Sequence, residues 1–273
     1  MPFVQRGDIA LHYQMVGAGP RLLVITGTGG DLRRRPGILD SPLAQRFSLL
    51  AYDQRGLGQS SKPDRAYSME EYAEDAAFLL GEIGWDSAAV LGISFGGMVA
   101  QELALRHPAK VERLALACTS PGGAGGASYP LHELIGLDIE TRSRHLMGIA
   151  DTRLDAAWVA ADPARAAAML DGAIAAMRPI DPDDAAVEIG ARRQLEARIG
   201  HDTFDRLPQL RMPVGIFGGK YDGIALPATQ KRMQRQIPGS TLRFFEGGHQ
   251  FLLQDPAAAP AIGEFLAGQL SKL

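Results

Sequence analysis

The sequence predicts an α/β fold, in which a mainly parallel, twisted sheet is flanked by helices and carries an inserted helical cap. Short apolar runs at residues 22–25, 47–52, 88–91 and 111–118 have the pattern of strands that are buried on both faces. Helical patterns alternate with these runs, which indicates a parallel sheet with right-handed crossover connections. The alternation stops after about residue 121, and this interruption predicts the inserted cap.

The first half of the chain contains one further strand pattern and two helices. Residues 9–16 alternate loosely, which predicts an antiparallel edge strand. A capping box at residues 68–71 begins a helix whose apolar residues recur at helical spacing until Gly84. A second helix follows the run at 88–91 and closes at His107, because a residue before proline avoids the helical conformation.

A glycine-rich stretch at 121–127 separates these elements from a segment that is rich in alanine and arginine. Residues 164–177 have high helix propensity because alanine, methionine and leucine dominate them, and the segment contains no strand pattern. We therefore expect a core made of residues 1–121 and 211–273, with a helical cap, or lid, inserted at 122–210. The alternative is a linker with ordinary packing helices.

The core pattern returns after the cap. Residues 214–217 and 241–245 predict two more strands, and a helix is expected between them at 228–236, where a Pro-Gly pair ends the pattern. The last predicted element is an amphipathic helix over 262–270 that docks on the sheet.

The composition of the 273 residues is typical of a soluble globular protein, with 46% hydrophobic and 22% charged residues. The net charge is −3 and no long basic tract occurs, so no nucleic-acid partner is expected. We also expect no membrane span and no signal peptide, because no apolar run approaches the roughly 18 to 20 residues that a span needs. The single cysteine, Cys118, cannot form an internal disulfide and suits a reducing compartment, so the expected location is the cytoplasm. The sequence does not predict the oligomeric state.

Residues 90–98 form an apolar run that breaks into a serine flanked by glycines and then resumes as a helical pattern. This is the Gly-x-Ser-x-Gly nucleophile elbow, in which a strained turn lifts the hydroxyl of Ser94 clear of a parallel sheet. Gly92 and Gly96 sit where a Cβ would collide with the neighbouring strand or helix. The pentapeptide alone also fits an ordinary turn that contains a serine, so its context has to support the catalytic interpretation.

A nucleophilic serine needs a general base within hydrogen-bond reach and a carboxylate that orients the base. Ligands collect outside the carboxyl ends of the strands in open α/β sheets, and two later strand ends offer suitable groups. Asp222 follows the strand at 214–217, and His249 follows the strand at 241–245 after a Gly-Gly pair. The order Ser94, Asp222, His249 is the one that the elbow motif requires, so these residues form the predicted catalytic triad.

Other residues compete for these roles. Asp222 also fits a simple Tyr-Asp-Gly turn. Asp53 ends the second buried strand, but it precedes the elbow and is expected to organise its own loop, which contains Arg55. Cys118 ends a strand-like run, and buried packing is its expected role. His107 ends a helix. The other histidines are expected at surface or cap positions: His12, His132, His145 and His201.

Acyl transfer also needs donors for the developing oxyanion, and backbone amides can supply them. The elbow geometry assigns one donor to the N–H of Phe95, the residue after the nucleophile. The second is expected in the glycine-rich loop after the first buried strand, at Thr28, with Gly27 and Gly29 as alternatives. This loop would also suit an anion nest, but it lacks the spacing of nucleotide-binding loops. The chain contains no metal-binding motif, and no cofactor is expected.

Together these motifs resemble the α/β-hydrolase family over essentially the whole chain. The resemblance rests on five segments: residues 26–30, 53–60, 92–97, 219–222 and 247–249. Within the family, the chain is most similar to small lid-bearing serine esterases and to 3-oxoadipate enol-lactonase-like hydrolases. Many members have His-Gly where this chain has Thr26 and Gly27, so the register of the second oxyanion donor stays open.

The resemblance and the ordered triad imply a cofactor-free serine hydrolase that cleaves a small-molecule carboxylic ester or lactone through an acyl-enzyme. Family members that open epoxides or remove halides carry aspartate at the elbow, so Ser94 argues against both activities. Carbon–carbon bond hydrolysis, hydroxynitrile cleavage and cofactor-free oxygenation use the same triad and stay open, as does a ligand receptor on a hydrolase scaffold. Five cap residues are candidates for an apolar substrate pocket, with helix packing as the alternative: Leu146, Met147, Trp158, Met169 and Met177.

Overall fold

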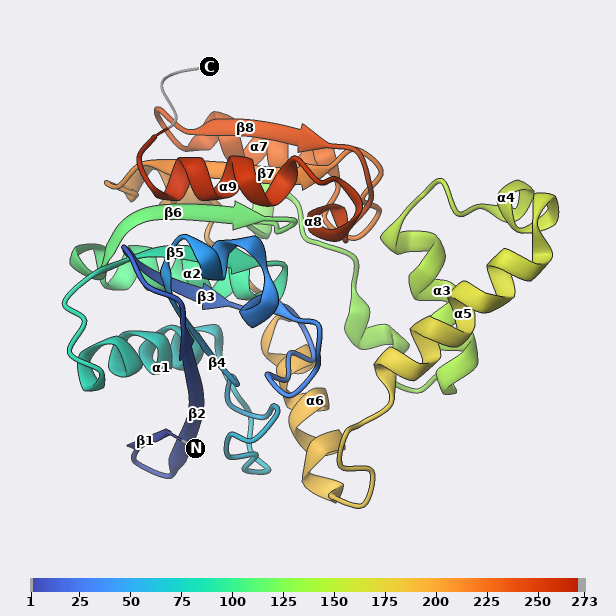
Figure 1. Ribbon diagram of the computed structural model, residues 1–273, viewed down its shortest axis with the longest axis horizontal. Helices are drawn as coiled ribbons and strands as arrows, with labels where there is room; N and C mark the ends of the chain where they lie inside the picture. The colour runs from blue at the N-terminus through green and yellow to red at the C-terminus, as the bar shows by residue number, and fades with distance from the viewer. Residues whose placement is uncertain (1, 270–273) are drawn as a thin grey trace.

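An eight-stranded sheet organises the protein in the computed structural model, which describes residues 2–269 (Figure 1). The strands lie side by side in the order β1-β2-β4-β3-β5-β6-β7-β8. The pairs β1–β2 and β2–β4 are antiparallel, and the other pairs are parallel, which confirms the predicted fold class. The strands are β1 (Phe3–Arg6), β2 (Ile9–Val16), β3 (Arg21–Ile25), β4 (Ser48–Tyr52), β5 (Ala88–Ile93), β6 (Val111–Ala117), β7 (Val214–Gly219) and β8 (Thr241–Phe245).

Helices connect the strands and form the segment between β6 and β7. The α-helices are α1 (Met69–Glu82), α2 (Phe95–Arg106), α3 (Ile139–Ala150), α4 (Ala156–Ala161), α5 (Pro163–Met177), α6 (Ala185–Ala197), α7 (Pro227–Gln236), α8 (Phe251–Gln254) and α9 (Ala258–Leu266). The predicted helix at 262–270 overlaps α9, and its last residue, Leu270, lies outside the described residues. No helix within residues 2–269 has the length and apolarity that crossing a membrane requires.

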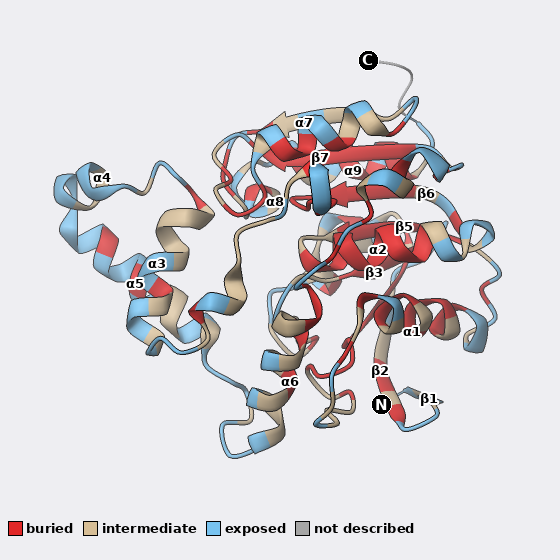
Figure 2. Cartoon of the chain, turned by 180° about the vertical axis from the view of Figure 1, so that it is seen from behind, coloured by how far each residue is buried: buried red, intermediate tan, exposed pale blue. Residues whose placement is uncertain are grey.

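Helices cover both faces of the sheet, and the alternation of each strand divides the apolar core between the two faces. In β3, Leu23 and Ile25 belong to the cluster that includes residues of α1 and α2, whereas Leu22 and Val24 belong to the cluster that includes residues of α9. Successive strand residues face opposite sides of a sheet, so burial on both sides explains why β3 reads as an unbroken apolar run. Figure 1 shows α9 across one face of the sheet, and Figure 2 shows α2 across the other.

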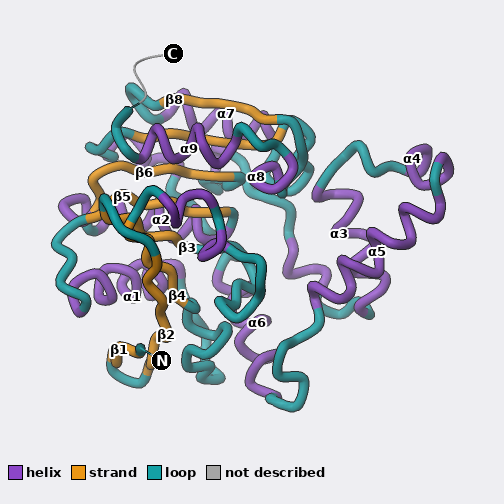
Figure 3. Tube along the Cα trace, in the orientation of Figure 1, coloured by secondary structure: helices purple, strands orange, loops and turns teal. Residues whose placement is uncertain are grey.

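Residues 118–213 leave the sheet after β6 and return to it at β7. They hold α3, α4, α5 and α6, which lie beyond the carboxyl ends of the parallel strands (Figure 3). The two ends of this segment meet, because Gly122 forms an isolated bridge with Asp202. The segment has the position of the predicted cap, and its boundaries at 122 and 210 and its action as a lid stay predictions.

Two predictions about the first strands were wrong. Residues 9–16 form β2, which is antiparallel as expected but is not an edge strand, because β1 pairs along its outer side. His12 on β2 is fully buried, and not at the surface as expected. Phe3 of β1 lies directly opposite His12, and the centroids of the two rings are 5.3 Å apart. Nδ1 of His12 lies 2.9 Å from Oδ2 of the buried Asp53, so His12 lies between Asp53 and the additional strand, whose four residues form too short a pattern to predict.

The stability of the fold depends on pH through His201. This side chain is 9% exposed, and burial lowers its pKa from 6.5 to about 4, although nearby Glu102 favours the charged form. Between these two pKa values the unfolded chain binds a proton that the folded chain does not, so stability falls as the pH falls through this window. At about 1.4 kcal/mol per pKa unit, the loss is on the order of 3 kcal/mol.

We expect His201→Gln to lose less stability than the wild type between about pH 7 and about pH 4.5, because glutamine takes up no proton on unfolding. Urea unfolding at the two pH values measures the difference. His145→Gln, which replaces an exposed histidine, is the matched control and should keep the pH dependence of the wild type. Equal pH dependence in the wild type and His201→Gln would contradict the assignment.

Candidate active site

The predicted nucleophile lies at a sharp turn between β5 and α2. Ser94 has φ 55° and ψ −116°, a conformation that non-glycine residues rarely adopt and that carries backbone strain. The turn comes very close to the end of β3, because a Cβ built on Gly96 would lie 2.0 Å from the carbonyl oxygen of Ile25. The amide of Ser94 donates to the carbonyl oxygen of Ala117 at 2.8 Å, which holds the turn against β6.

The three predicted triad residues come together in a hydrogen-bonded chain. His249 Nε2 lies 2.9 Å from Ser94 Oγ, and His249 Nδ1 lies 2.9 Å from Oδ2 of Asp222. Asp222 is 1% exposed, and its Oδ1 accepts from the backbone amides of Ile224 and Ala225, each at 2.8 Å. Because a carboxylate only accepts hydrogen bonds, Nδ1 carries the proton and Nε2 is left to accept the hydroxyl proton of Ser94.

The cap segment braces the two loops that carry Asp222 and His249. At the end of α3, the carbonyl oxygen of Ala150 accepts from the amide of His249 at 2.6 Å, and that of Ile149 accepts from the amide of Gly223 at 3.0 Å. Two residues further, Thr152 donates its amide to the carbonyl oxygen of Tyr221 at 3.0 Å. Sequence reasoning missed these contacts, since backbone hydrogen bonds leave no mark in the identity of the residues.

The structure narrows the alternatives for the second oxyanion donor. The amide of Gly29 donates to Oε1 of Gln194 at 2.9 Å, so it is already engaged. Gly27 lies beside the nucleophile, because a Cβ built on it would lie 3.3 Å from Cβ of Ser94. Thr28, between these glycines, stays the predicted donor in this loop, with Gly27 as the alternative.

Phe95 is the first residue of α2, and it is the predicted source of the other donor. The first amides of a helix have no acceptor within the helix, so the N–H of Phe95 is free of α2 and can donate to an oxyanion. This amide and Thr28 follow β5 and β3, which are hydrogen-bonded neighbours in the sheet.

The competing residues are engaged elsewhere. Asp53 accepts from the amides of Leu32 at 2.8 Å and Gln59 at 3.0 Å, so it organises loops as expected. Cys118 is 2% exposed, and burial raises the pKa of its thiol, which keeps the sulfur protonated and agrees with a packing role. Within residues 2–269 no group of three or more His, Cys, Asp or Glu residues could hold a metal ion.

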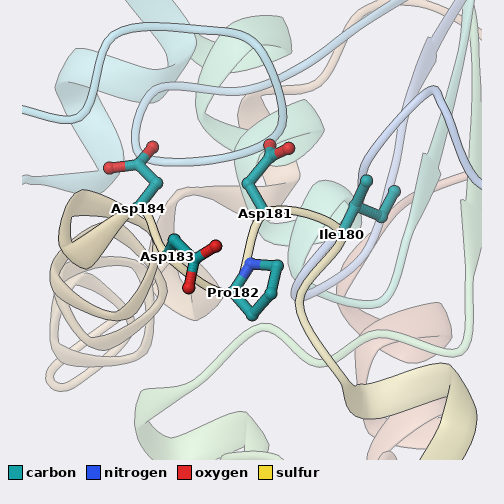
Figure 4. A pocket seen from close by; sticks show the side chains of 5 residues that line it. All are labelled: Ile180, Asp181, Pro182, Asp183 and Asp184. Atoms are coloured by element: carbon teal, nitrogen blue, oxygen red, sulfur yellow. The ribbon is translucent and has the colours of Figure 1, made fainter.

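Two hollows lie near the predicted site or the cap. One of about 590 Å³ is in the turn between α5 and α6, and Figure 4 shows the side chains that line it, from Ile180 to Asp184. Asp181 in this turn forms an ion pair with Arg33 at 2.6 Å, which joins the turn to the loop after β3. The other, of about 190 Å³, adjoins the loop after β3 and is lined in part by Thr26.

Comparisons with known proteins agree with this fold. Residues 20–138 match the family described as alpha/beta hydrolase fold. A hydrolase from Pseudomonas aeruginosa PA01 has a crystal structure that superposes with a TM-score of 0.78 at 25% sequence identity, over 97% of each chain. The chain has the α/β-hydrolase fold. The resemblance of the sequence motifs to the α/β-hydrolase family is thereby confirmed.

Two further proteins are similar to this chain. The enol-lactonase from Burkholderia xenovorans LB400 superposes with a TM-score of 0.75 at 22% identity, over 99% of this chain and 100% of that one, and shares the fold. Polyketide synthase ThaQ from Burkholderia thailandensis is 33% identical over 255 residues, which are 92% of this chain. That match spans 12% of the length of ThaQ.

The glycine at position 96 provides a test of the elbow. We expect Gly96→Ala to lower the free energy of unfolding by about 1 to 3 kcal/mol, because the new methyl group would overlap the carbonyl group of Ile25. Gly81→Ala is the matched control, since Gly81 lies in α1 and nothing lies within 4 Å of its added Cβ. This control should gain roughly 0.5 to 1 kcal/mol, and urea unfolding measures both. Equal stability of the two variants would show that the elbow tolerates a side chain there.

Proposed function

We propose that this α/β hydrolase is a serine hydrolase that cleaves a small-molecule carboxylic ester or lactone through an acyl-enzyme. The observation that carries the proposal is the hydrogen-bonded chain from Ser94 Oγ through His249 to Asp222, with 2.9 Å at each step. A serine, a histidine and a carboxylate in this order have the geometry of a nucleophile, its general base and the group that orients the base.

The first half of the proposed reaction forms the acyl-enzyme. Ser94 Oγ attacks the acyl carbon while His249 Nε2 takes the hydroxyl proton, and a tetrahedral intermediate forms. His249 then donates that proton to the leaving oxygen as the bond between the acyl carbon and this oxygen breaks. Asp222 keeps the imidazole in the required tautomer and stabilises the imidazolium that exists between the two proton transfers.

The second half releases the acyl group. Water loses a proton to His249 Nε2 and attacks the acyl carbon, and the proton returns to Ser94 Oγ as the acyl-enzyme bond breaks. In both halves the negative charge on the carbonyl oxygen would be held by the amides of Phe95 and Thr28. Removing one donor of this kind from a hydrolase costs about 3 to 4 kcal/mol of transition-state stabilisation.

The proposed substrate class rests on the triad and on the sequence motifs. It is compatible with the fold, which an enol-lactonase shares. The five apolar cap residues named above remain candidates for the pocket. Two of them, Met169 and Met177, differ in their surroundings. Met169 is 39% exposed, whereas the sulfur of Met177 lies 3.1 Å from the hydroxyl oxygen of Ser143 on α3, which is a packing contact.

Ser94→Ala tests the proposal. We expect the wild type to hydrolyse members of a panel of acyl esters and lactones, and the variant to lose at least about 10³-fold in kcat because the nucleophile is absent. A serine-reactive phosphonate should label the wild type at one site and leave the variant unlabelled. A panel that includes diketones tests carbon–carbon bond hydrolysis in the same assay. Equal turnover and equal labelling of the two proteins would falsify the proposed nucleophile.

A further inference from the structure

We propose that Gln194, on cap helix α6, is a positioning residue that fixes the oxyanion loop from outside the core. The inference rests on the proposed function, because it assigns a role in the same reaction. Its basis is the hydrogen bond from the amide of Gly29 to Oε1 of Gln194, 2.9 Å long, between residues 165 positions apart in the chain. No motif in the sequence connects these two residues.

The position of Gln194 follows from the close approach of α6 to the core. The backbone of α6 touches the loop after β4 at Gly190, where an added Cβ would lie 1.9 Å from the carbonyl oxygen of Gly56. Gln194 is four residues further along, so it lies on the same face of the helix one turn away. The absence of a side chain at Gly190 lets the helix sit close enough for Gln194 to reach the loop after β3.

The burial of Gln194 indicates which polar atom of its side chain, Oε1 or Nε2, forms the contact with the loop. The side chain is 0% exposed, and its Nε2 is buried with no partner among the described residues, whereas Oε1 is paired with Gly29. A buried donor without an acceptor is unfavourable, commonly by about 1 to 3 kcal/mol. The atom through which Gln194 acts on the loop is therefore the acceptor Oε1.

The hydrogen bond acts on the loop that would bind the oxyanion. Gly29 has φ +71°, and it directly follows Thr28. Two other hydrogen bonds involve the backbone of residues 26–30: the amide of Gly30 donates to the carbonyl oxygen of Gly27 at 3.3 Å, and Nε2 of Gln54 donates to that of Thr26 at 2.8 Å. With Gly29 held, the preceding peptide groups have less freedom, so the amide of Thr28 is pre-organised toward the carbonyl oxygen bound at Ser94. Pre-organised donors of this kind stabilise the transition state more than the bound substrate.

Three variants separate positioning from packing. Gln194→Met has nearly the same length but no acceptor, and Gln194→Glu keeps an acceptor at that length. Arg193→Gln is the matched control on the same helix, because it removes partly exposed ion pairs with Asp64 and Glu196 that contribute little to stability. The readouts are kcat and KM for an ester that the wild type hydrolyses, the melting temperature, and the amide exchange rate of Gly29 followed by NMR.

For Gln194→Met we expect kcat to fall by roughly 10- to 100-fold with KM within about threefold, because the lost contact matters mainly in the transition state. The melting temperature should change little, because the variant removes one unpaired donor, Nε2, and leaves another, the amide of Gly29, without its acceptor. Exchange at Gly29 should accelerate at least about tenfold. Gln194→Glu should restore slow exchange, and Arg193→Gln should match the wild type in every readout.

If the wild type shows Ser94-dependent turnover, an unchanged kcat in Gln194→Met would overturn the proposed role of Gln194. Unchanged exchange at Gly29 would overturn it as well. A fall in melting temperature with kcat intact would show packing only. The failure of the proposed function is a different result, because the wild type itself would then lack Ser94-dependent turnover. The exchange of Gly29 reports on the hydrogen bond in either case.

Discussion

The strained turn at Ser94 is held in place by contacts with the strands on both of its sides. A φ of +55° is unfavourable for a serine, typically by about 1 to 3 kcal/mol, and such a conformation persists only where its surroundings fix it. The hydroxyl of Thr119 donates to the carbonyl oxygen of Ser94, and the amide of Ser94 donates to Ala117. Gly96 brings the start of α2 against the end of β3, so the turn is held from β3 on one side and from β6 on the other.

The parallel sheet explains how distant residues reach this turn. Ser94, Asp222 and His249 follow β5, β7 and β8, and parallel strands present all their carboxyl ends at one edge. Between β5 and β7, the end of β6 carries Cys118 with φ +41°, and the amide of this residue donates to Phe217 of β7. The spacing of the strands thus largely determines how far apart Ser94, Asp222 and His249 lie.

The sequence predicts those parts of the site that depend on residue identity. Gly92 and Gly96 around Ser94 mark a turn in which a larger residue would collide with its neighbours, and the positions of Asp222 and His249 after apolar runs predict their place at the same edge of the sheet. The buried position of His12 was mispredicted because it depends on β1, whose four residues form no recognisable pattern, and on the contact with Asp53, 41 positions away in the chain. The bracing by Ile149 and Ala150 could not be predicted, since it uses carbonyl oxygens that every residue has. The contact of Gln194 joins two segments whose proximity only the folded chain defines.

Some helices of the cap contact the loops of the predicted site, and others do not. The end of α3 supports the loops of Asp222 and His249, and α6 touches the loop after β3 through Gln194. By contrast, α4 and much of α5 are exposed in Figure 2. A motion of the whole segment would break the bonds that hold the loops of Asp222 and His249, whereas α4 and α5 could shift without breaking these bonds. The insertion therefore holds the loops of Asp222 and His249 through the end of α3 and the loop after β3 through α6, while α4 and much of α5 make no such contact in the described part of the chain.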